Sequence, residues 1–411
     1  MRELSIPLEE AARLSGPMAF NIMLKPAGSL CNLDCAYCYY LDKSALYGGR
    51  EPRMSMDTLE GVTRAYIEAN DVPEVQFVWH GGEPLVLGID FYRRALELQE
   101  KYAAGKKINN TIQTNGVLLD AAWADFFRHH HFLVGISIDG PREIHDKYRK
   151  EKGGSPSFDK VMRGIEYLRT AGVEFNTMST VNKASEGKGL EVFRFLKSIG
   201  SRYMQFMPVV EHVKGESARI VDPSEDGAEI APWSVSALGF GGFLCDIFDE
   251  WVRNDVSRVF VGQFDAALAS WCGVQPGICV FAETCGGNSV IEHNGDLYPC
   301  DHFVYQKYKL GNIAEKSIRT MMSSDEQVRF GIDKLNRLPS KCRKCQWQFT
   351  CHGECPKHRF NRTERGETGL NALCEGYRMF FSHAAPYMDY MKRMLSQGIP
   401  AAAVIPWARL R

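Results

Sequence analysis

From residue 21 to about residue 210, short apolar segments alternate with longer segments in which apolar residues recur every three or four positions. The short segments are rich in β-branched and aromatic residues and mostly end at Gly, Pro or Asn, which predicts strands. The predicted strands cover residues 21–26, 74–80, 110–115, 132–139, 173–181 and 202–209. Strands that alternate with helices predict an α/β fold with a parallel sheet and right-handed crossovers.

The segments between these strands carry helical signals. Three groups of apolar residues recur at helical spacing. The first group follows Ser55 and contains Leu59, Val62, Tyr66 and Ala69. The second lies between Ser157 and Gly172 and contains Phe158, Val161, Ile165 and Leu168, and the third precedes Gly200 and contains Leu190, Phe193 and Leu196. Ser157 is a predicted N-cap and Gly172 a predicted stop. Six strand–helix units are fewer than the eight of a closed barrel.

The second half of the chain has a weaker pattern. Residues 214–232 are acidic and polar, which predicts a loop, and residues 233–256 predict a helix. Residues 272–374 are rich in Cys with little periodicity, and residues 374–397 predict a helix that ends near Gly398.

The composition is that of an ordinary globular protein, with 45% hydrophobic and 24% charged residues among 411. The net charge of −1 gives no electrostatic reason to expect nucleic acid or an anionic membrane as a partner. Residues 1–16 carry acids and lack the apolar core of a secretory signal. No apolar run approaches the ~18 residues of a membrane span. We therefore expect a cytoplasmic protein.

The thirteen Cys are unevenly placed. Three occur by residue 38, none follows until Cys245, and nine lie between Cys272 and Cys374. Clustered Cys in a protein that is not secreted more often bind metal than form disulfides. The distribution predicts two metal-binding regions separated by a Cys-free scaffold.

The first group, Cys31, Cys35 and Cys38, forms a C-x3-C-x2-C motif directly after the first predicted strand. Three thiolates can hold three corners of a four-iron cluster and leave one iron open. A structural zinc site is the alternative, but it normally needs four ligands, and no fourth Cys or His lies nearby. Three unrelated thiols are the remaining possibility.

With Tyr37 before its last Cys, this motif resembles the signature of the radical S-adenosylmethionine (SAM) enzymes. The resemblance implies a partial (β/α)6 barrel and an open iron that binds the amine and carboxylate of SAM. It also implies that an electron splits SAM into a 5′-deoxyadenosyl radical, which removes a hydrogen atom from the substrate.

The same resemblance implies that Tyr37 contacts SAM, together with several further residues. Gly82 lies in His80-Gly81-Gly82-Glu83-Pro84, which resembles the GGEP motif that contacts the SAM amino group. Ser137 and Arg149 match positions that contact the ribose and carboxylate, and Met204 matches an adenine contact. Without the resemblance, Ser137 would be an inward strand serine, Arg149 a surface cation and Met204 a core residue.

Eight further Cys form two groups. One is Cys279-x5-Cys285-x14-Cys300, and the other is Cys342-x2-Cys345-x5-Cys351-x3-Cys355 followed by Cys374. Eight thiolates are enough for two complete sites. Zinc is again an alternative, since Cys342-x2-Cys345 is also half of a zinc ribbon.

The order of these Cys resembles the SPASM extension of peptide-modifying radical SAM enzymes. The resemblance implies two auxiliary [4Fe–4S] clusters with interleaved ligands. The first would take Cys279, Cys285, Cys300 and Cys355, and the second Cys342, Cys345, Cys351 and Cys374. We interpret Cys245 as a buried helix thiol and assign no role to Cys272.

Asp301 follows Cys300 and a predicted hairpin over residues 292–298, whose turn is Asn294-Gly295. By itself Asp301 would be a cap or a surface acid. Pro-Cys-Asp resembles the anaerobic sulfatase-maturating enzymes, in which this Asp is the catalytic base. His302 fits a structural role better than that of a base.

The resemblance to those maturases extends from Met23 to about Tyr377. It implies that Tyr40, His80 and Gln113 line the peptide site, although His80 stands where some relatives have Gln.

We therefore predict a radical SAM dehydrogenase with three [4Fe–4S] clusters, which converts a sulfatase Ser or Cys to Cα-formylglycine by β-hydrogen abstraction. Its expected partners are an unfolded or nascent sulfatase and an electron donor such as flavodoxin or ferredoxin. The alternatives are a SPASM maturase of another peptide, for instance one that forms thioethers, and a zinc-stabilised interaction module. The expected domains are a radical SAM barrel (1–240), a helical connector (241–271), a SPASM-type domain (272–380) and a C-terminal helix and tail (381–411).

Overall fold

The computed structural model describes residues 5–13, 19–48, 52–215, 219–222, 225 and 227–411. The chain forms two compact units, each assembled from separate segments. The first unit contains Met1–Ser137, Arg149–Phe175 and Thr284–Asn336, and the second contains Ile138–Tyr148, Asn176–Glu283 and Arg337–Arg411. The domain boundaries expected from the sequence stay a prediction.

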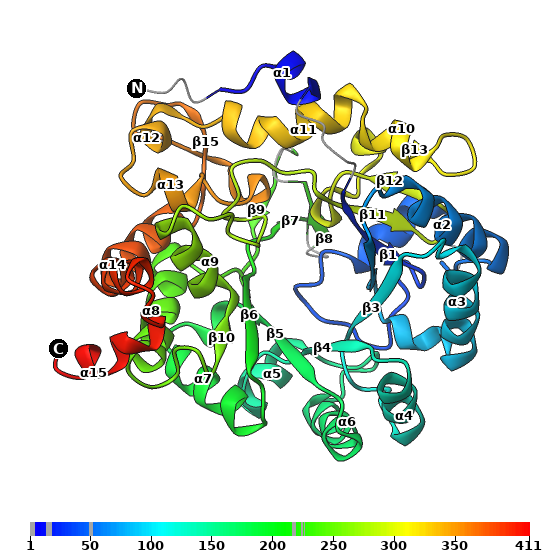
Figure 1. Ribbon diagram of the computed structural model, residues 1–411, viewed down its shortest axis with the longest axis horizontal. Coiled ribbons are helices and arrows are strands. Elements are labelled where there is room, and N and C mark those ends of the chain that lie inside the picture. The colour runs from blue at the N-terminus through cyan, green and yellow to red at the C-terminus, as the bar shows by residue number, and fades with distance from the viewer. Residues whose placement is uncertain (1–4, 14–18, 49–51, 216–218, 223–224, 226) are drawn as a thin grey trace. The chain divides into compact units, whose positions relative to one another are not determined.

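The first unit is built on a sheet whose parallel strands run in the order β4, β3, β2, β1 and β11. Their bounds are Asn21–Lys25 for β1, Glu74–Trp79 for β2, Lys107–Thr114 for β3, Leu133–Ser137 for β4 and Asn288–Glu292 for β11. The antiparallel strands β12 (Asp296–Tyr298) and β13 (Gly311–Asn312) continue the sheet beyond β11 (Figure 1). The predicted hairpin is therefore confirmed, and its first strand lies beside β1.

The helices of the first unit lie between these strands and at both ends of the strand series. They are α1 (Leu8–Arg13), α2 (Met56–Ala69), α3 (Ile89–Tyr102), α4 (Ala121–His129), α6 (Phe158–Ala171), α10 (Ile318–Met322) and α11 (Asp325–Asn336). Short 3₁₀ segments are η1 (Leu41–Tyr47), η2 (Pro84–Leu87), η4 (Asp301–Phe303) and η5 (Gln306–Tyr308).

Two of the predicted helix ends are confirmed, and one predicted cap needs correction. The Ser55 hydroxyl accepts a bond from the Thr58 N–H at the start of α2. Gly172 ends α6 in the left-handed region, with a φ of 72°. Ser157 stands at the N-cap position of α6 but makes no cap. Its hydroxyl donates instead to the Arg149 carbonyl oxygen at 2.7 Å, because that oxygen is buried beside it.

The second unit contains the parallel strands β5 (Phe175–Val181), β6 (Tyr203–Pro208) and β10 (Phe260–Val261). Its helices are α5 (Arg142–Tyr148), α7 (Gly189–Ser198), α8 (Ala237–Asn254), α9 (Gly262–Trp271), α12 (Ser340–Arg343), α13 (Gln348–Cys351), α14 (Cys374–Ser396) and α15 (Val404–Ala408). The short elements are η3 (Lys183–Ser185), η6 (Pro356–His358), η7 (Ala401–Ala403) and the hairpin of β14 (Asn361–Arg362) with β15 (Thr368–Leu370).

The second unit places its longest helices against each other. A Cβ on Gly376 of α14 would overlap the Ala237 carbonyl, so glycine lets α14 approach α8 closely. The helix predicted over residues 374–397 is confirmed as α14, and that predicted over residues 233–256 as α8.

The six predicted strands β1 to β6 are confirmed within a few residues, but the predicted loop over residues 214–232 is partly wrong. In this region β7 (His212–Lys214), β8 (Arg219–Val221) and β9 (Glu229–Ile230) form a small antiparallel sheet in the order β8, β7, β9. These strands are two or three residues long, too short for a period-two pattern to be recognised. No helix within the described residues is long and apolar enough to cross a membrane.

Candidate active site and cysteine clusters

The N-terminal Cys motif follows β1 in an irregular loop that is fixed by the backbone of a distant segment. The Asp34 N–H donates to the Lys150 carbonyl at 2.7 Å, and Leu33 forms a β-bridge with Glu151. This pairing brings Arg149 to the motif, and its guanidinium lies 5.6 Å from the centre of the Tyr37 ring. Tyr37 and Arg149, both predicted to contact SAM, therefore lie together although they are far apart in sequence.

The Gly-Gly-Glu-Pro segment after β2 holds the other side of this loop. The Gly82 N–H donates to the Gly28 carbonyl at 2.7 Å, and the Glu83 N–H donates to the Leu30 carbonyl at 2.8 Å. A Cβ on Gly82 would overlap the Leu30 carbonyl oxygen. Glycine at position 82 is therefore required for close approach of the two backbones.

The Glu83 side chain ties the same segment to the end of β3. Its carboxylate accepts bonds from the Thr114 hydroxyl at 2.7 Å and from the Asn115 N–H at 2.8 Å. Burial raises the pKa of Glu83 to about 7, against the effect of these donors. The Asn115 amide in turn donates to Asn32 at 2.8 Å, beside Cys31. Glu83 is thus a structural residue of the Cys loop, a role that the sequence did not predict.

We expect Gly82→Ala to lose the N-terminal cluster, because the added methyl group cannot fit against Leu30. Iron content should fall by about four per chain, the content of one cubane. Gly61→Ala is the control, since a Cβ there meets only the Ile313 side chain, at 3.7 Å. Iron and sulfide analysis of anaerobically purified protein checks the expectation, and full iron content in Gly82→Ala would show that the close approach is not needed.

Burial also changes the pKa values of two thiols in the N-terminal Cys motif. It raises the pKa of Cys31 to about 12 and raises the pKa of Cys38. Thiols of this kind become ligands only when a metal group replaces their protons. The three Cys follow one strand end in one loop, an arrangement that fits a three-ligand cluster.

A buried network of charged and phenolic groups surrounds Asp301, which begins η4 directly after Cys300. Lys25, the last residue of β1, forms an ion pair with the Asp301 carboxylate, and its side chain is only 1% exposed. The Tyr39 hydroxyl donates to the same carboxylate. The Lys25 ammonium also lies 3.7 Å from the centre of the Tyr40 ring, whose hydroxyl donates to Glu292.

The charges in this network decide the protonation of Asp301. Burial would raise the pKa of its carboxyl, but the charge of Lys25 and its bond to the carboxylate outweigh burial and hold the pKa below its ordinary value. Asp301 is therefore ionised and able to accept a proton. Sequence reasoning predicted Asp301 but missed Lys25, Tyr39 and Glu292. A charged residue that ends an apolar strand, as Lys25 does, was the available signal.

His80 is neutral and accepts a hydrogen bond in this structure. Burial, with Lys25 nearby, lowers its pKa to about 4. Its Nδ1 accepts the Gly81 N–H at 2.7 Å, so the ring proton lies on Nε2. Gln113 donates its amide to the Ser137 hydroxyl at 2.9 Å, and the missing Cβ of Gly135 leaves room for it. The structure therefore pairs Gln113, predicted to line the peptide site, with Ser137, predicted to contact SAM.

The first unit thus contains most of the predicted active-site residues, whereas other predicted residues lie in the second unit. Met204 is buried on β6 of the second unit, and its role as an adenine contact stays a prediction. Among the ligands expected for the first auxiliary cluster, Cys285 and Cys300 belong to the first unit, and Cys279 and Cys355 belong to the second. That ligand set also stays a prediction.

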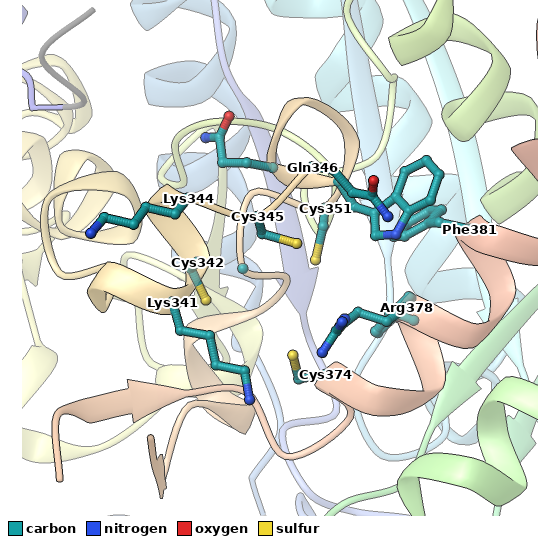
Figure 2. Close-up of a pocket in the computed structure, with 13 residues that line it drawn as sticks. Lys341, Cys342, Lys344, Cys345, Gln346, Cys351, Cys374, Arg378 and Phe381 are labelled. Carbon is teal, nitrogen blue, oxygen red and sulfur yellow. The ribbon is translucent and has the colours of Figure 1, made fainter. Parts of the chain in front are cut away.

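The expected ligands of the second auxiliary cluster all lie in the second unit and line one cavity of about 440 Å³. Figure 2 shows the sulfur atoms of Cys342, Cys345, Cys351 and Cys374 pointing into it from α12, α13 and α14 and the turns beside them. Among the described residues, no three His, Cys, Asp or Glu side chains are arranged to hold a single metal ion. Four thiols that line one cavity fit the expected four-Cys ligand set, and that set stays a prediction.

Two family models match this chain and define its class of enzyme. The family model of the radical SAM superfamily matches residues 26–196, and that of the SPASM iron–sulfur cluster-binding domain matches residues 279–346. The chain is therefore a radical SAM enzyme with a SPASM domain.

Close relatives then define the family. The chain is 49% identical over 386 residues to the serine-type anaerobic sulfatase-maturating enzyme of Bacteroides thetaiotaomicron, covering 92% of this chain and 93% of that protein. It is 34% identical over 387 residues to the cysteine-type enzyme of Clostridium novyi, covering 92% and 98%. The solved structure of native anSMEcpe with bound AdoMet and Cp18Cys peptide matches with a TM-score of 0.80 and 30% identity, covering 92% and 99%. The chain belongs to the anaerobic sulfatase-maturating enzymes.

These findings confirm the predicted fold class, a partial radical SAM barrel with a parallel sheet, then a SPASM domain and a long C-terminal helix. They also confirm the predicted enzyme class. SAM and iron–sulfur clusters are the cofactors of this architecture, and SAM is bound in the related structure.

Proposed function

We propose that this enzyme oxidises a Ser or Cys side chain in an unfolded or nascent sulfatase to Cα-formylglycine, with Asp301 as the base. The observation that carries the proposal is the buried Lys25–Asp301–Tyr39 network, which supplies an ionised carboxylate in the same unit as the Cys motif. The serine-type and cysteine-type names of the relatives support both side chains as substrates.

The proposed cofactors are SAM and three [4Fe–4S] clusters. When bound, they supply the radical that removes a β-hydrogen and a route for electrons. Cys31, Cys35 and Cys38 would hold the N-terminal cluster. The proposed SAM-binding residues are Tyr37, Gly82, Ser137, Arg149 and Met204, and the Arg149 guanidinium suits bidentate binding of the SAM carboxylate.

The residues around Asp301 would handle the proton. Asp301 takes the proton of the substrate hydroxyl or thiol, while Lys25 and Tyr39 hold the carboxylate in position. The His80 Nε2–H can donate to a substrate oxygen, and Tyr40 and Gln113 complete the proposed peptide site. In this structure the Tyr40 hydroxyl donates to Glu292, so its contact with the peptide would be through the ring.

The proposed oxidation requires a redox partner. Oxidation of a primary alcohol to an aldehyde, or of a thiol to a thioaldehyde, removes two electrons, and abstraction of the hydrogen atom accounts for one of them. The second electron leaves the substrate as an electron, for which the auxiliary clusters are the proposed acceptors. Water then hydrolyses the thioaldehyde to the aldehyde with release of hydrogen sulfide. A flavodoxin or ferredoxin is the proposed electron donor, and its oxidised form is the proposed acceptor of the second electron.

The test is anaerobic incubation with SAM, a reductant and sulfatase-motif peptides that carry Ser, Cys or Ala at the target position. We expect the Ser peptide to lose the mass of dihydrogen, and the Ser and Cys products to react with a hydrazide. The Ala peptide should not change. A cross-linked product without a carbonyl would instead support the thioether alternative.

We expect metal analysis to find about twelve irons and as many sulfides per chain, the content of three cubanes. Cys345→Ser should lower this by about four irons, because Cys345 lines the cavity of a single cluster. Reductive SAM cleavage should persist in that variant, since the N-terminal Cys motif is unchanged. Zinc with little sulfide would contradict the cluster assignment and support an interaction module.

A further inference from the structure

A second cavity lies in the same unit as the cavity that holds Cys342, Cys345, Cys351 and Cys374. It has a volume of about 550 Å³ and is formed by the end of α9, the α13 region and α14. Its aromatic lining consists of Trp271, Trp347 and Phe349, and its charged residues are Asp389 and Lys392. Phe349 is 41% exposed, so this cavity, here called the outer hollow, reaches solvent.

Trp347 joins the two cavities, because it lines both of them. Its ring stacks on Trp271 with centroids 5.8 Å apart and lies 6.2 Å from Phe381, which lines the cysteine cavity (Figure 2). The Trp271 indole N–H donates to the Asp389 carboxylate at 3.0 Å, which fixes that ring. A continuous series of aromatic contacts therefore leads from the four thiols to the outer hollow.

The linings of the two cavities together contain more cations than carboxylates. Lys392 is exposed at the outer hollow, and Lys344 and Arg378 are exposed at the cysteine cavity. Asp389, the one carboxylate in the lining of the two cavities, already accepts the Trp271 bond. A group of cations around an aromatic hollow attracts a partner with an acidic surface.

We propose that the outer hollow with Lys392, together with Lys344 and Arg378 at the cysteine cavity, forms the docking surface for an acidic one-electron carrier protein. This inference rests on the proposed function, in which Cys342, Cys345, Cys351 and Cys374 hold a cluster. With a reduced cluster held there, Trp347 would lie on the route of one electron to the oxidised carrier. The transfer would oxidise the cluster by one electron and reduce the carrier by one, with no bond made or broken.

The first test measures binding of oxidised flavodoxin to the anaerobically purified holoenzyme by titration calorimetry. We expect the dissociation constant to rise with ionic strength, and Lys392→Glu to weaken binding roughly tenfold, as a charge reversal at a steered interface does. Lys147→Glu is the matched control, because Lys147 is an exposed cation on α5 that lines neither cavity. Equal binding by wild type and Lys392→Glu would overturn the docking surface.

The second test follows electron transfer from the dithionite-reduced holoenzyme to oxidised flavodoxin by stopped-flow absorbance. Trp347→Leu should slow the transfer and Trp347→Phe should restore part of the rate, with iron content unchanged in both. An unchanged rate in Trp347→Leu would overturn the Trp347 route. Neither test uses a peptide substrate, so a failure of formylglycine formation remains distinguishable from a failure of docking.

Discussion

Asp301→Asn is expected to reduce carbonyl formation by at least about 10²-fold, the usual contribution of a general base. Asn has nearly the shape of Asp and still fills the space between Lys25 and Tyr39, but it cannot take a proton from the substrate. Iron content and release of 5′-deoxyadenosine should stay near wild type, because neither needs the base. Mass measurement of the peptide and chromatography of the nucleoside give the two readouts.

Asp296→Asn is the matched control for this variant. Asp296 lies on the same hairpin and is paired with Lys309 at 2.6 Å, outside the network of Asp301. The same chemical change there should leave the ratio of carbonyl product to deoxyadenosine unaltered. Turnover of Asp301→Asn at the wild-type rate would remove Asp301 as the base and leave the radical chemistry without an assigned proton acceptor.

Lys25→Met is the second change with a large expected effect. It removes the cation from a buried ion pair and leaves Asp301 with an unpaired charge in a site where Lys25 is 1% and Asp301 16% exposed. Breaking a buried pair in this way typically costs about 3–5 kcal/mol. We expect a lower midpoint of thermal unfolding and a loss of carbonyl formation.

The double variant Lys25→Met/Asp301→Asn separates charge pairing from packing. Because it removes both charges, its unfolding midpoint should recover toward wild type, which is the signature of direct coupling between the two residues. Lys107→Met is the control, since the Lys107–Glu74 pair is largely exposed and should matter little. Strictly additive shifts in the double variant would show that Lys25 stabilises the fold without acting on Asp301.

Much of the fold could be predicted from sequence because most strands and helix ends are determined by residues that are neighbours in the chain. The apolar segments that became β1 to β6 were recognisable from a few neighbouring residues each, as were the Ser55 cap of α2 and the Gly172 stop of α6. The two-to-three-residue strands β7, β8 and β9 were not, because strands of that length are defined by their partners.

In the candidate site, too, some features could be predicted from neighbouring residues and others could not. The Cys31–Cys35–Cys38 spacing indicated a cluster with an open iron by ligand count alone. The roles of Ser137, Arg149, Met204 and Asp301 came from resemblance, since a Ser, an Arg, a Met or an Asp has many possible uses. The structure added the pairing of residues 33–34 with 150–151, which explains why Arg149 lies at the Cys loop.

The sequence by itself determined the α/β class, the first six strands and the cysteine groups, because periodicity and ligand spacing are properties of neighbouring residues. Only the tertiary structure decided that β11 pairs in parallel with β1, with Lys25 opposite Glu292. That register brings the residue after Cys300 to the end of β1, where Lys25 and Tyr39 meet Asp301. Contacts between residues more than 250 positions apart depend on how strands choose partners, and no local pattern encodes that choice.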